Sequence, residues 1–272
     1  MKIIDAHIHY SVGHSHFNNL AKAAGHENTE AHLREVYAKE GIKLAIVMSN
    51  LNRDPDVQSN PDFTRYCAGV HQDALDPARL NDALDLTERH LRSDLCVGLK
   101  IYAGYTHVNL SDPVYAPFYE LAIQYDKPVA VHMGVTANPR GLLRYCHPLQ
   151  MDDAAVAFPK ARFVMCHFGN PWLMDAAAVL EKNENVAADM SGLIAGNFNV
   201  DEFARAQYGY VEQLKTWITY VEDYEKFMFG TDWPLTNIGE YIRLMERLIP
   251  ARYLDLVYYE NAKRIYKLSD LE

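Results

Sequence analysis

The chain has 272 residues, of which 49% are hydrophobic and 23% are charged, so it can bury a sizeable core and is not disordered. Its formal net charge of −10 argues against a nucleic-acid partner, because binding to a phosphate backbone needs a basic face. No apolar run reaches the ~18 residues of a membrane span, and the N-terminus lacks the apolar segment of a secretory signal. We therefore expect a cytoplasmic protein with no membrane partner. Its four cysteines form no CxxC pair, which is typical of buried free thiols.

Short apolar runs alternate with helix-period stretches along the whole chain. Eight runs are nearly continuous in apolar character, as expected of strands covered on both faces. These eight predicted strands are Lys2–Ala6, Leu44–Met48, Tyr66–Val70, Cys96–Ile101, Val129–His132, Phe163–His167, Val186–Met190 and Phe227–Gly230.

The segments between these runs carry helix start and stop signals. Gly41 is a natural residue after a helix end, and Asp76-Pro77 is a typical start. A longer helical stretch, Val200–Tyr224, is expected to break near Gly209. The other predicted helices are Glu30–Glu40, Ala78–Ser93, Val114–Tyr125, Met151–Phe158, Trp172–Lys182, Ile238–Leu248 and Leu254–Leu268.

Eight strands that alternate with helices imply parallel pairing through right-handed crossovers. We predict one α/β domain over residues 1–272, a (β/α)8 TIM barrel, whose usual length is about 250 residues. A doubly wound open sheet is the alternative. It would usually place a glycine-rich phosphate loop after the first strand, where this chain has His-Ile-His-Tyr.

Polar residues at the C-terminal ends of barrel strands form the active sites of such folds. His7 and His9 are two residues apart, so on a strand they share a face and can chelate one cation. His132 follows a buried strand and would complete a three-nitrogen site with an open position, the pattern of catalytic zinc. A hydrogen-bonded core histidine is the alternative for His132, and a capping or turn aspartate is the alternative for Asp232. Other strand ends carry Lys100, Tyr102, His167, Asp189 and Ser191.

In these strand-end motifs the sequence resembles the amidohydrolase superfamily. More narrowly, it resembles the amidohydrolase-related branch, which contains aminocarboxymuconate-semialdehyde decarboxylase, resorcylate decarboxylase and dicarboxylate lactonases. The ending Asn261–Leu268 also looks like that branch. The resemblance rests on four motifs: Asp5-Ala-His7-Ile-His9, Lys127-Pro-Val-Ala-Val-His132, Phe163-Val-Met-Cys-His167-Phe-Gly and Phe229-Gly-Thr-Asp232-Trp-Pro.

The resemblance implies a barrel of the metallo-dependent hydrolase type with a divalent metal, usually zinc. His7, His9 and His132 match its ligand positions, and Asp232 matches the aspartate that binds the metal and its water. His167 matches a histidine that contacts the metal water in decarboxylases and binds a second metal in binuclear hydrolases.

Lys100 leaves the number of metal ions open. In binuclear relatives a carboxylated lysine at the end of strand four bridges two metals, and Gly98-Leu-Lys100-Ile-Tyr102 puts a lysine about there. In members with one metal, a similar lysine meets a substrate anion or the acid of strand seven. A purely structural role is the third alternative. We expect one ion, and two if Lys100 is carboxylated.

Two reactions fit these residues. In a metal-dependent hydrolase, a metal-activated water attacks a small carboxylic ester, lactone or amide, Asp232 moves the proton, and His167 orients the substrate oxygen. In the alternative, a non-oxidative decarboxylase or hydratase, Asp232 or His167 protonates a carbon of a small unsaturated or aromatic acid. A structural metal site or a binding protein is a third hypothesis, disfavoured because closed structural zinc sites are usually rich in cysteine.

Further substrate-binding candidates lie in or beside the strand-end loops. Arginine is the preferred bidentate carboxylate ligand, and the loop over residues 134–147 is long for its position. The substrate should be a small molecule, and a homodimer is a possible assembly. A group of four histidines is expected at solvated positions rather than in a second metal patch: His14, His16, His26 and His32. The substrate-binding candidates are Lys100, Tyr102, Arg140, Arg144, His147 and Trp233.

Overall fold

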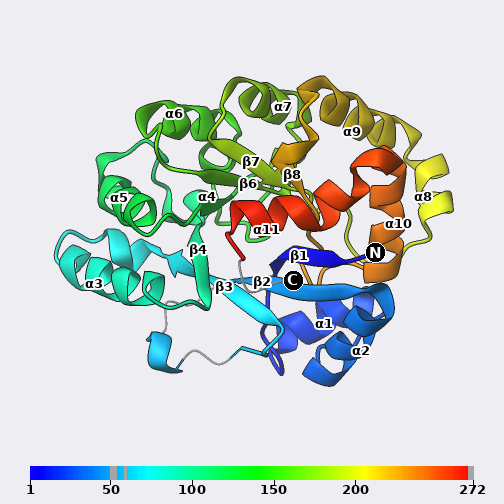
Figure 1. The fold of residues 1–272 in the computed structure, drawn as a ribbon, viewed down its shortest axis with the longest axis horizontal. Helices are drawn as coiled ribbons and strands as arrows, with labels where there is room; N and C mark the ends of the chain where they lie inside the picture. The colour runs from blue at the N-terminus through cyan, green and yellow to red at the C-terminus, as the bar shows by residue number, and fades with distance from the viewer. Residues whose placement is uncertain (50–53, 58–59, 269–272) are drawn as a thin grey trace.

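A computed structural model describes residues 1–49, 54–57 and 60–268 of the chain. Eight parallel strands form one sheet in sequence order, surrounded by helices (Figure 1). The sheet closes where the Ala6 N–H donates to the Phe229 carbonyl at 2.9 Å and Ile8 pairs with Trp233. The strands are β1 (Ile3–Ile8), β2 (Ile42–Met48), β3 (Thr64–Val70), β4 (Cys96–Ile101), β5 (Val129–His132), β6 (Phe163–Cys166), β7 (Val186–Asp189) and β8 (Phe227–Met228).

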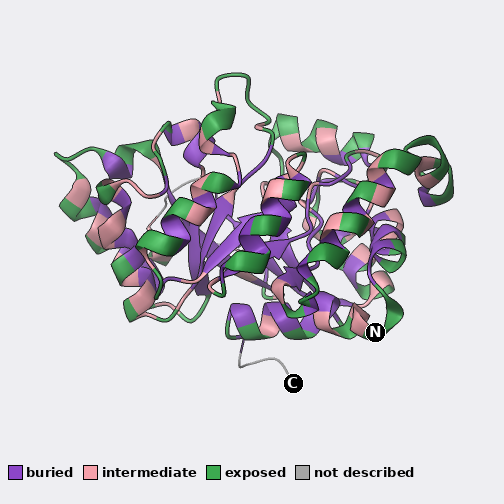
Figure 2. Ribbon diagram, turned by 90° about the horizontal axis from the view of Figure 1, so that it is seen from above, coloured by how far each residue is buried: buried purple, intermediate pink, exposed green. Residues whose placement is uncertain are grey.

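The outer layer is built from helices that turn their buried sides to the strands and their exposed sides to solvent (Figure 2). The helices are α1 (Ser15–Ala23), α2 (Glu30–Glu40), α3 (Leu80–Leu91), α4 (Ala103–Thr106), α5 (Ala116–Gln124), α6 (Leu149–Ala157), α7 (Leu173–Lys182), α8 (Val200–Ala206), α9 (Tyr208–Val221), α10 (Ile238–Leu248) and α11 (Asn261–Ile265). Single turns of 3-10 helix lie at Pro55–Val57, Gln72–Leu75, Pro113–Tyr115, Leu143–Tyr145, His167–Gly169, Tyr224–Lys226 and Ala251–Tyr253.

The N-terminal end of the barrel is covered by the C-terminal segment of the chain. A π-helix at Leu256–Glu260 precedes α11, which lies across the barrel in Figure 1. Ala262 and Ile265 pack into one buried cluster with Ile4 of β1 and Leu44 of β2. This end of the barrel is therefore filled by core side chains, and the opposite, C-terminal end is left for a site.

The eight predicted strands and the (β/α)8 barrel are confirmed, with strand ends shifted by a few residues. The break predicted near Gly209 within Val200–Tyr224 is confirmed. The helix breaks at Gln207, whose backbone is not helical, and Gly209 lies inside α9. Helices α1 and α4 were not predicted. In α1 only Ala21 is buried, although Phe17, Leu20 and Ala21 have the i, i+3, i+4 spacing of an apolar helix face.

Within the parts of the chain that the structure describes, no helix is both long enough and apolar enough to span a membrane.

Candidate metal centre

The ends of β1 and β8 are joined by hydrogen bonds, and this junction places the first three candidate ligands. The Asp232 N–H donates to the His7 carbonyl at 2.8 Å. The Thr231 N–H and hydroxyl donate to the two carboxylate oxygens of Asp5 at 2.8 and 2.6 Å. Asp232 adopts a left-handed backbone conformation with φ of 57°. The β8 loop therefore turns the Asp232 carboxylate back towards the histidines of β1.

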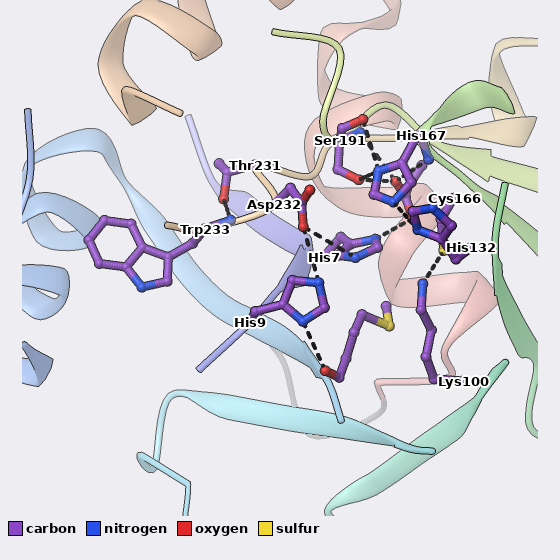
Figure 3. A network of polar contacts seen from close by, with 12 residues as sticks. His7, His9, Lys100, His132, Cys166, His167, Ser191, Thr231, Asp232 and Trp233 are labelled. Carbon is purple, nitrogen blue, oxygen red and sulfur yellow. Dashed lines mark hydrogen bonds and ion pairs between the residues drawn. The ribbon is translucent and has the colours of Figure 1, made fainter. Parts of the chain in front are cut away.

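His7, His9 and Asp232 converge on one point (Figure 3). Asp232 Oδ1 lies 3.3 Å from His9 Nε2 and 3.6 Å from His7 Nε2. Burial alone would raise the pKa of Asp232, but its contact with His9 and the nearby His167 and His7 outweigh burial and hold that pKa below its usual range. The carboxylate is therefore ionised at neutral pH.

The other nitrogens of the two β1 histidines are already engaged. His7 Nδ1 lies 2.9 Å from Asp189 Oδ2, and His9 Nδ1 lies 3.2 Å from the Met48 carbonyl. Because a carbonyl and a carboxylate only accept, both Nδ1 atoms must carry hydrogen, which leaves a lone pair on each Nε2. Two nitrogen lone pairs and a carboxylate oxygen thus face one another.

Such an arrangement fits a metal cation. Among the described residues, His7 Nε2 and Asp232 Oδ1 are buried and have no hydrogen-bond partner. Ligand atoms about 2.0–2.2 Å from a tetrahedral zinc ion lie roughly 3.3–3.6 Å apart, which matches the observed separations. A carboxylate behind a ligating histidine is also the usual support of a metal ligand. The donor set therefore suits a divalent ion held by His7, His9 and Asp232.

His132 and His167 lie next to this cluster. His132 Nδ1 is 3.1 Å from His167 Nε2, and His132 Nε2 is 3.3 Å from the Val135 carbonyl. The ring centroids of His7 and His167 are 4.7 Å apart. Burial lowers the pKa of both His132 and His167, so both imidazoles are neutral at neutral pH. His132 lies outside the group of described ligand atoms that approach within 4.8 Å of one another, and its role as a ligand stays a prediction.

Asp189 connects the histidines of β1 and β6. Its Oδ1 accepts from the backbone N–H groups of His167 at 3.0 Å and Ser191 at 3.1 Å, and also from the Ser191 hydroxyl. That hydroxyl lies 2.9 Å from His167 Nδ1. His7, Cys166 and Asp189 form a second close group, but His7 Nδ1 and Asp189 already bind each other there. This second group is therefore less suited to a metal ion.

A cavity of about 1250 Å³ opens beside the cluster, with His9, His132, His167 and Asp232 in its wall. Tyr102 also lines it, stacked between His71 at 6.0 Å and His132 at 6.2 Å between ring centroids. Lining residues that the sequence analysis did not identify include His71, Arg79 and Tyr105. His71 directly follows β3, so a survey of every strand end would have found it.

Lys100 lies beneath this cavity and outside its lining. Its side chain is fully buried, and Nζ lies 2.8 Å from Cys166 Sγ (Figure 3). Nζ also lies 5.1 Å from the centre of the Tyr102 ring. The structure thus places Lys100 against a thiol in the barrel interior.

Many proteins share this barrel fold, but the sequence also matches one family of known proteins. The sequence matches the family described as "Amidohydrolase" over residues 4–268. The chain belongs to the amidohydrolase family. This confirms the relationship that the four motifs indicate. A search among curated proteins gives no match.

Solved structures share the fold of this amidohydrolase at low sequence identity. An uncharacterised TIM-barrel protein of Bordetella bronchiseptica is 17% identical, with 100% of both chains covered and a TM-score of 0.71. A putative 2-pyrone-4,6-dicarboxylic acid hydrolase of Pseudomonas putida is 16% identical, with 100% and 99% covered and a TM-score of 0.67. A 2,6-dihydroxybenzoate decarboxylase of Rhizobium is 14% identical, with 99% of both chains covered and a TM-score of 0.67.

Besides Lys100, four predicted substrate contacts of this amidohydrolase lie away from the cavity wall. Arg140 is exposed, and Arg144 is exposed with its guanidinium 4.8 Å from the centre of the Tyr145 ring. His147 Nε2 lies 3.4 Å from Asp175 Oδ2. The fourth, the buried indole of Trp233, faces away from the cavity and packs against His26. The ring centroids of these two residues are 5.2 Å apart.

The expectation of solvated positions fails for two of the four grouped histidines. His26 Nε2 accepts from the Ile238 N–H at the start of α10, and His26 Nδ1 lies 3.0 Å from His32 Nε2. Burial, followed by the neighbouring His32, lowers the pKa of His26 to about 4. His14 and His16 are exposed, as expected. The tertiary contact with α10, remote in sequence, is what buries His26.

Proposed function

We propose that this amidohydrolase is a metal-dependent hydrolase that cleaves a small carboxylic ester, lactone or amide. The observation that carries the proposal is the convergence of His7 Nε2, His9 Nε2 and Asp232 Oδ1 beside a cavity. One divalent ion, zinc foremost, would be held there, with His132 as the further candidate ligand. When bound, such an ion lowers the pKa of a coordinated water from about 15.7 to about 7.

The residues of the chain supply the proton transfer and the positioning. Asp232 is ionised, so it can accept the proton of the attacking water and deliver it to the leaving group. His167 is fixed by Ser191 and by its backbone contact with Asp189, and it lines the cavity. In our proposal, His167 orients the oxygen of the substrate carbonyl.

The cavity wall suggests what kind of substrate fits. Tyr102, Tyr105 and His71 offer ring faces that suit a planar or cyclic group. Arg79, which also lines the cavity, can bind a substrate carboxylate. Lys100 would reach a substrate only by leaving its contact with Cys166, and two metals would require its carboxylation. A lactone or ester of a carboxylic acid is therefore the substrate class that we favour.

The second candidate is non-oxidative decarboxylation, or hydration, of a small aromatic or unsaturated acid. The aromatic wall favours it as well, because a flat acid could stack on Tyr102 while Arg79 binds its carboxylate. Asp232 or His167 would first take up a proton from the substrate or from water, since Asp232 is ionised and His167 is neutral at rest, and would then deliver that proton to the reacting carbon. Two of the three similar structures reported above have names that state a reaction, one a hydrolase and the other a decarboxylase.

The test begins with elemental mass spectrometry of gently purified protein, where we expect about one zinc or manganese per chain. The metal-loaded protein is then offered lactones, esters and amides beside aromatic and unsaturated acids, with hydrolysis and carbon dioxide release measured together. Hydrolysis without carbon dioxide release supports the first proposal. Carbon dioxide release from acids alone rejects it in favour of the second. A protein that takes up no metal on incubation contradicts both.

A further inference from the structure

Lys100 of β4 and Cys166 of β6 meet inside the barrel, below the residues that line the cavity. Both side chains are fully buried. Ala130 of β5 is in register with Lys100 and belongs to the same buried cluster as Cys166. Because alanine contributes only a methyl group to this layer, the lysine chain can pass over β5 to the thiol. The contact therefore joins two strands that are not neighbours in the sheet.

The separation of the two atoms is unusual for a hydrogen bond. Lys100 Nζ lies 2.8 Å from Cys166 Sγ. Sulfur is larger than oxygen, so a nitrogen-to-sulfur hydrogen bond is longer than the roughly 2.7–3.2 Å of a bond from nitrogen to oxygen. The sulfur contact between Cys96 Sγ and the Gly98 carbonyl in this protein measures 3.4 Å. Bonds of about 1.4 Å from nitrogen and about 1.7 Å from sulfur that meet at one oxygen at about 110–120° would place nitrogen and sulfur roughly 2.5–2.7 Å apart. The observed 2.8 Å is closer to this range than to that of a hydrogen bond.

The burial of Lys100 also argues against a simple hydrogen bond between an ammonium group and a thiol. An ammonium group buried away from water is costly unless charged and strongly accepting groups surround it. The amino group of Lys100 contacts a thiol sulfur, which is a weak acceptor, and the face of the Tyr102 ring, and it interacts electrostatically with the ionised Asp189 without a direct ion pair. A nitrogen bonded to oxygen in a bridge is uncharged, so this cost would disappear.

We propose that in the oxidised protein one oxygen atom links Lys100 Nζ covalently to Cys166 Sγ. Dioxygen is the oxidant. One of its oxygen atoms forms the Nζ–O and O–Sγ bonds, while the thiol and the amine each lose one hydrogen. The second oxygen atom leaves with these two hydrogens as water. Sulfur and nitrogen each give up two electrons, and these four electrons reduce the dioxygen.

The bridge is reversible by thiols and has a consequence for the metal centre. Two equivalents of a dithiol supply four electrons and four protons, which restores the thiol and the amine and releases water. The bridge ties β4 to β6 beneath His132 and His167. It also removes a positive charge from the neighbourhood of His7, so the oxidised and reduced proteins differ at the centre.

The test is the intact mass of the wild-type protein after exposure to dioxygen, compared under denaturing conditions with the same protein treated with dithiothreitol. The oxidised chain should be about 14 Da heavier, since it gains one oxygen and loses two hydrogens, whereas sulfenic and sulfinic acids add about 16 and 32 Da. Trypsin should then fail to cleave after Lys100 and should give a cross-linked pair of peptides containing Lys100 and Cys166.

Matched variants locate the bridge. Cys96→Ser, which removes another buried thiol, should keep the mass shift of about 14 Da, while Cys166→Ser and Lys100→Arg should lose it. Identical masses of oxygen-exposed and reduced wild-type protein, with normal cleavage after Lys100, would overturn the proposal. The decisive comparison uses the wild-type chain and needs neither bound metal nor a substrate.

Discussion

His7 Nδ1 lies 2.9 Å from Asp189 Oδ2, on the side of the imidazole opposite to Asp232. Burial alone would raise the pKa of Asp189, but its contact with His7 outweighs burial and holds that pKa far below its usual range. The ionised carboxylate therefore keeps hydrogen on Nδ1 and a lone pair on Nε2. Asp189 is a positioning residue for the candidate metal centre.

Asp189→Asn should weaken metal binding. The amide loses the charge that fixes the His7 tautomer, and such changes behind a ligand cost about 10–100-fold in affinity. Competition with a chelating dye measures the dissociation constant directly. Asp153→Asn, at an exposed position on α6, is the matched control and should bind metal like the wild type. An unchanged affinity of Asp189→Asn would show that the tautomer of His7 is fixed by other contacts.

Asp232→Asn should abolish most turnover on a confirmed substrate. The amide cannot accept a proton, and positioned acid–base groups contribute about 10²–10⁴-fold to rates. Steady-state kinetics should show this loss mainly in kcat, at a metal content matched to the wild type. The same Asp153→Asn variant serves as control. Wild-type turnover of Asp232→Asn would refute its role in proton transfer.

Arg79→Gln should raise the KM for an anionic substrate about tenfold while kcat changes little, because the arginine lines the cavity away from the candidate metal ligands. Arg140→Gln is the informative comparison, since Arg140 is exposed and outside the cavity lining. If Arg140→Gln raises KM and Arg79→Gln does not, the long loop over residues 134–147 binds the substrate after all.

Gly192→Ala should disturb the site. A Cβ atom there would lie 2.7 Å from His167 Nδ1 and 3.2 Å from Asp232 Oδ2, and the backbone has a φ of +64°. We expect a loss of about 1–3 kcal/mol in unfolding free energy together with reduced metal content. Gly209→Ala is the control, and we expect it to change the unfolding free energy in the opposite direction. It lies in α9 with open space around its Cβ position, so it should gain about 0.5–1 kcal/mol. Urea denaturation measures both; equal stability of the two variants would contradict this account.

Because His26 resists protonation in the folded protein, the protein should lose stability in mild acid. Its pKa falls from 6.5 unfolded to about 4 folded, so near pH 5 the unfolded chain binds a proton that the folded chain does not. Stability is therefore lost as pH falls from about 6.5 to 4, by roughly 1–2 kcal/mol after allowance for partial exposure. His26→Gln should flatten this part of the stability profile, and His14→Gln, at an exposed position, should not. A profile unchanged in His26→Gln would assign the acid sensitivity to other groups.

Most strands and helices of this fold can be predicted from local sequence. A strand of a parallel barrel is covered on both faces, so it reads as a continuous apolar run, and β4 and β5 have the predicted bounds. The weaker elements escaped prediction, since α1 buries little and α4 spans only Ala103–Thr106. The stability of such short helices comes mainly from their tertiary contacts, which local sequence does not show.

The candidate site was predictable in part for the same reason. His7 and His9 share a strand face, and the Asp232 motif lies at another strand end, so sequence spacing and chain order suffice to gather them. Arg79 and Tyr105 were missed because they lie beyond strand ends, on segments whose orientation depends on how the helices pack. The position of Trp233 next to His26 likewise depends on the docking of α2 and α10.

By itself, the sequence determined the alternation of strands and helices, the family, and which side chains end the strands, because apolar periodicity and residue identity are local properties. Only the tertiary structure decided which nitrogen of His7 faces Asp232, which residues line the cavity, and that Lys100 meets Cys166. These relationships depend on strand register and on closure of the barrel, which bring together atoms far apart in the chain.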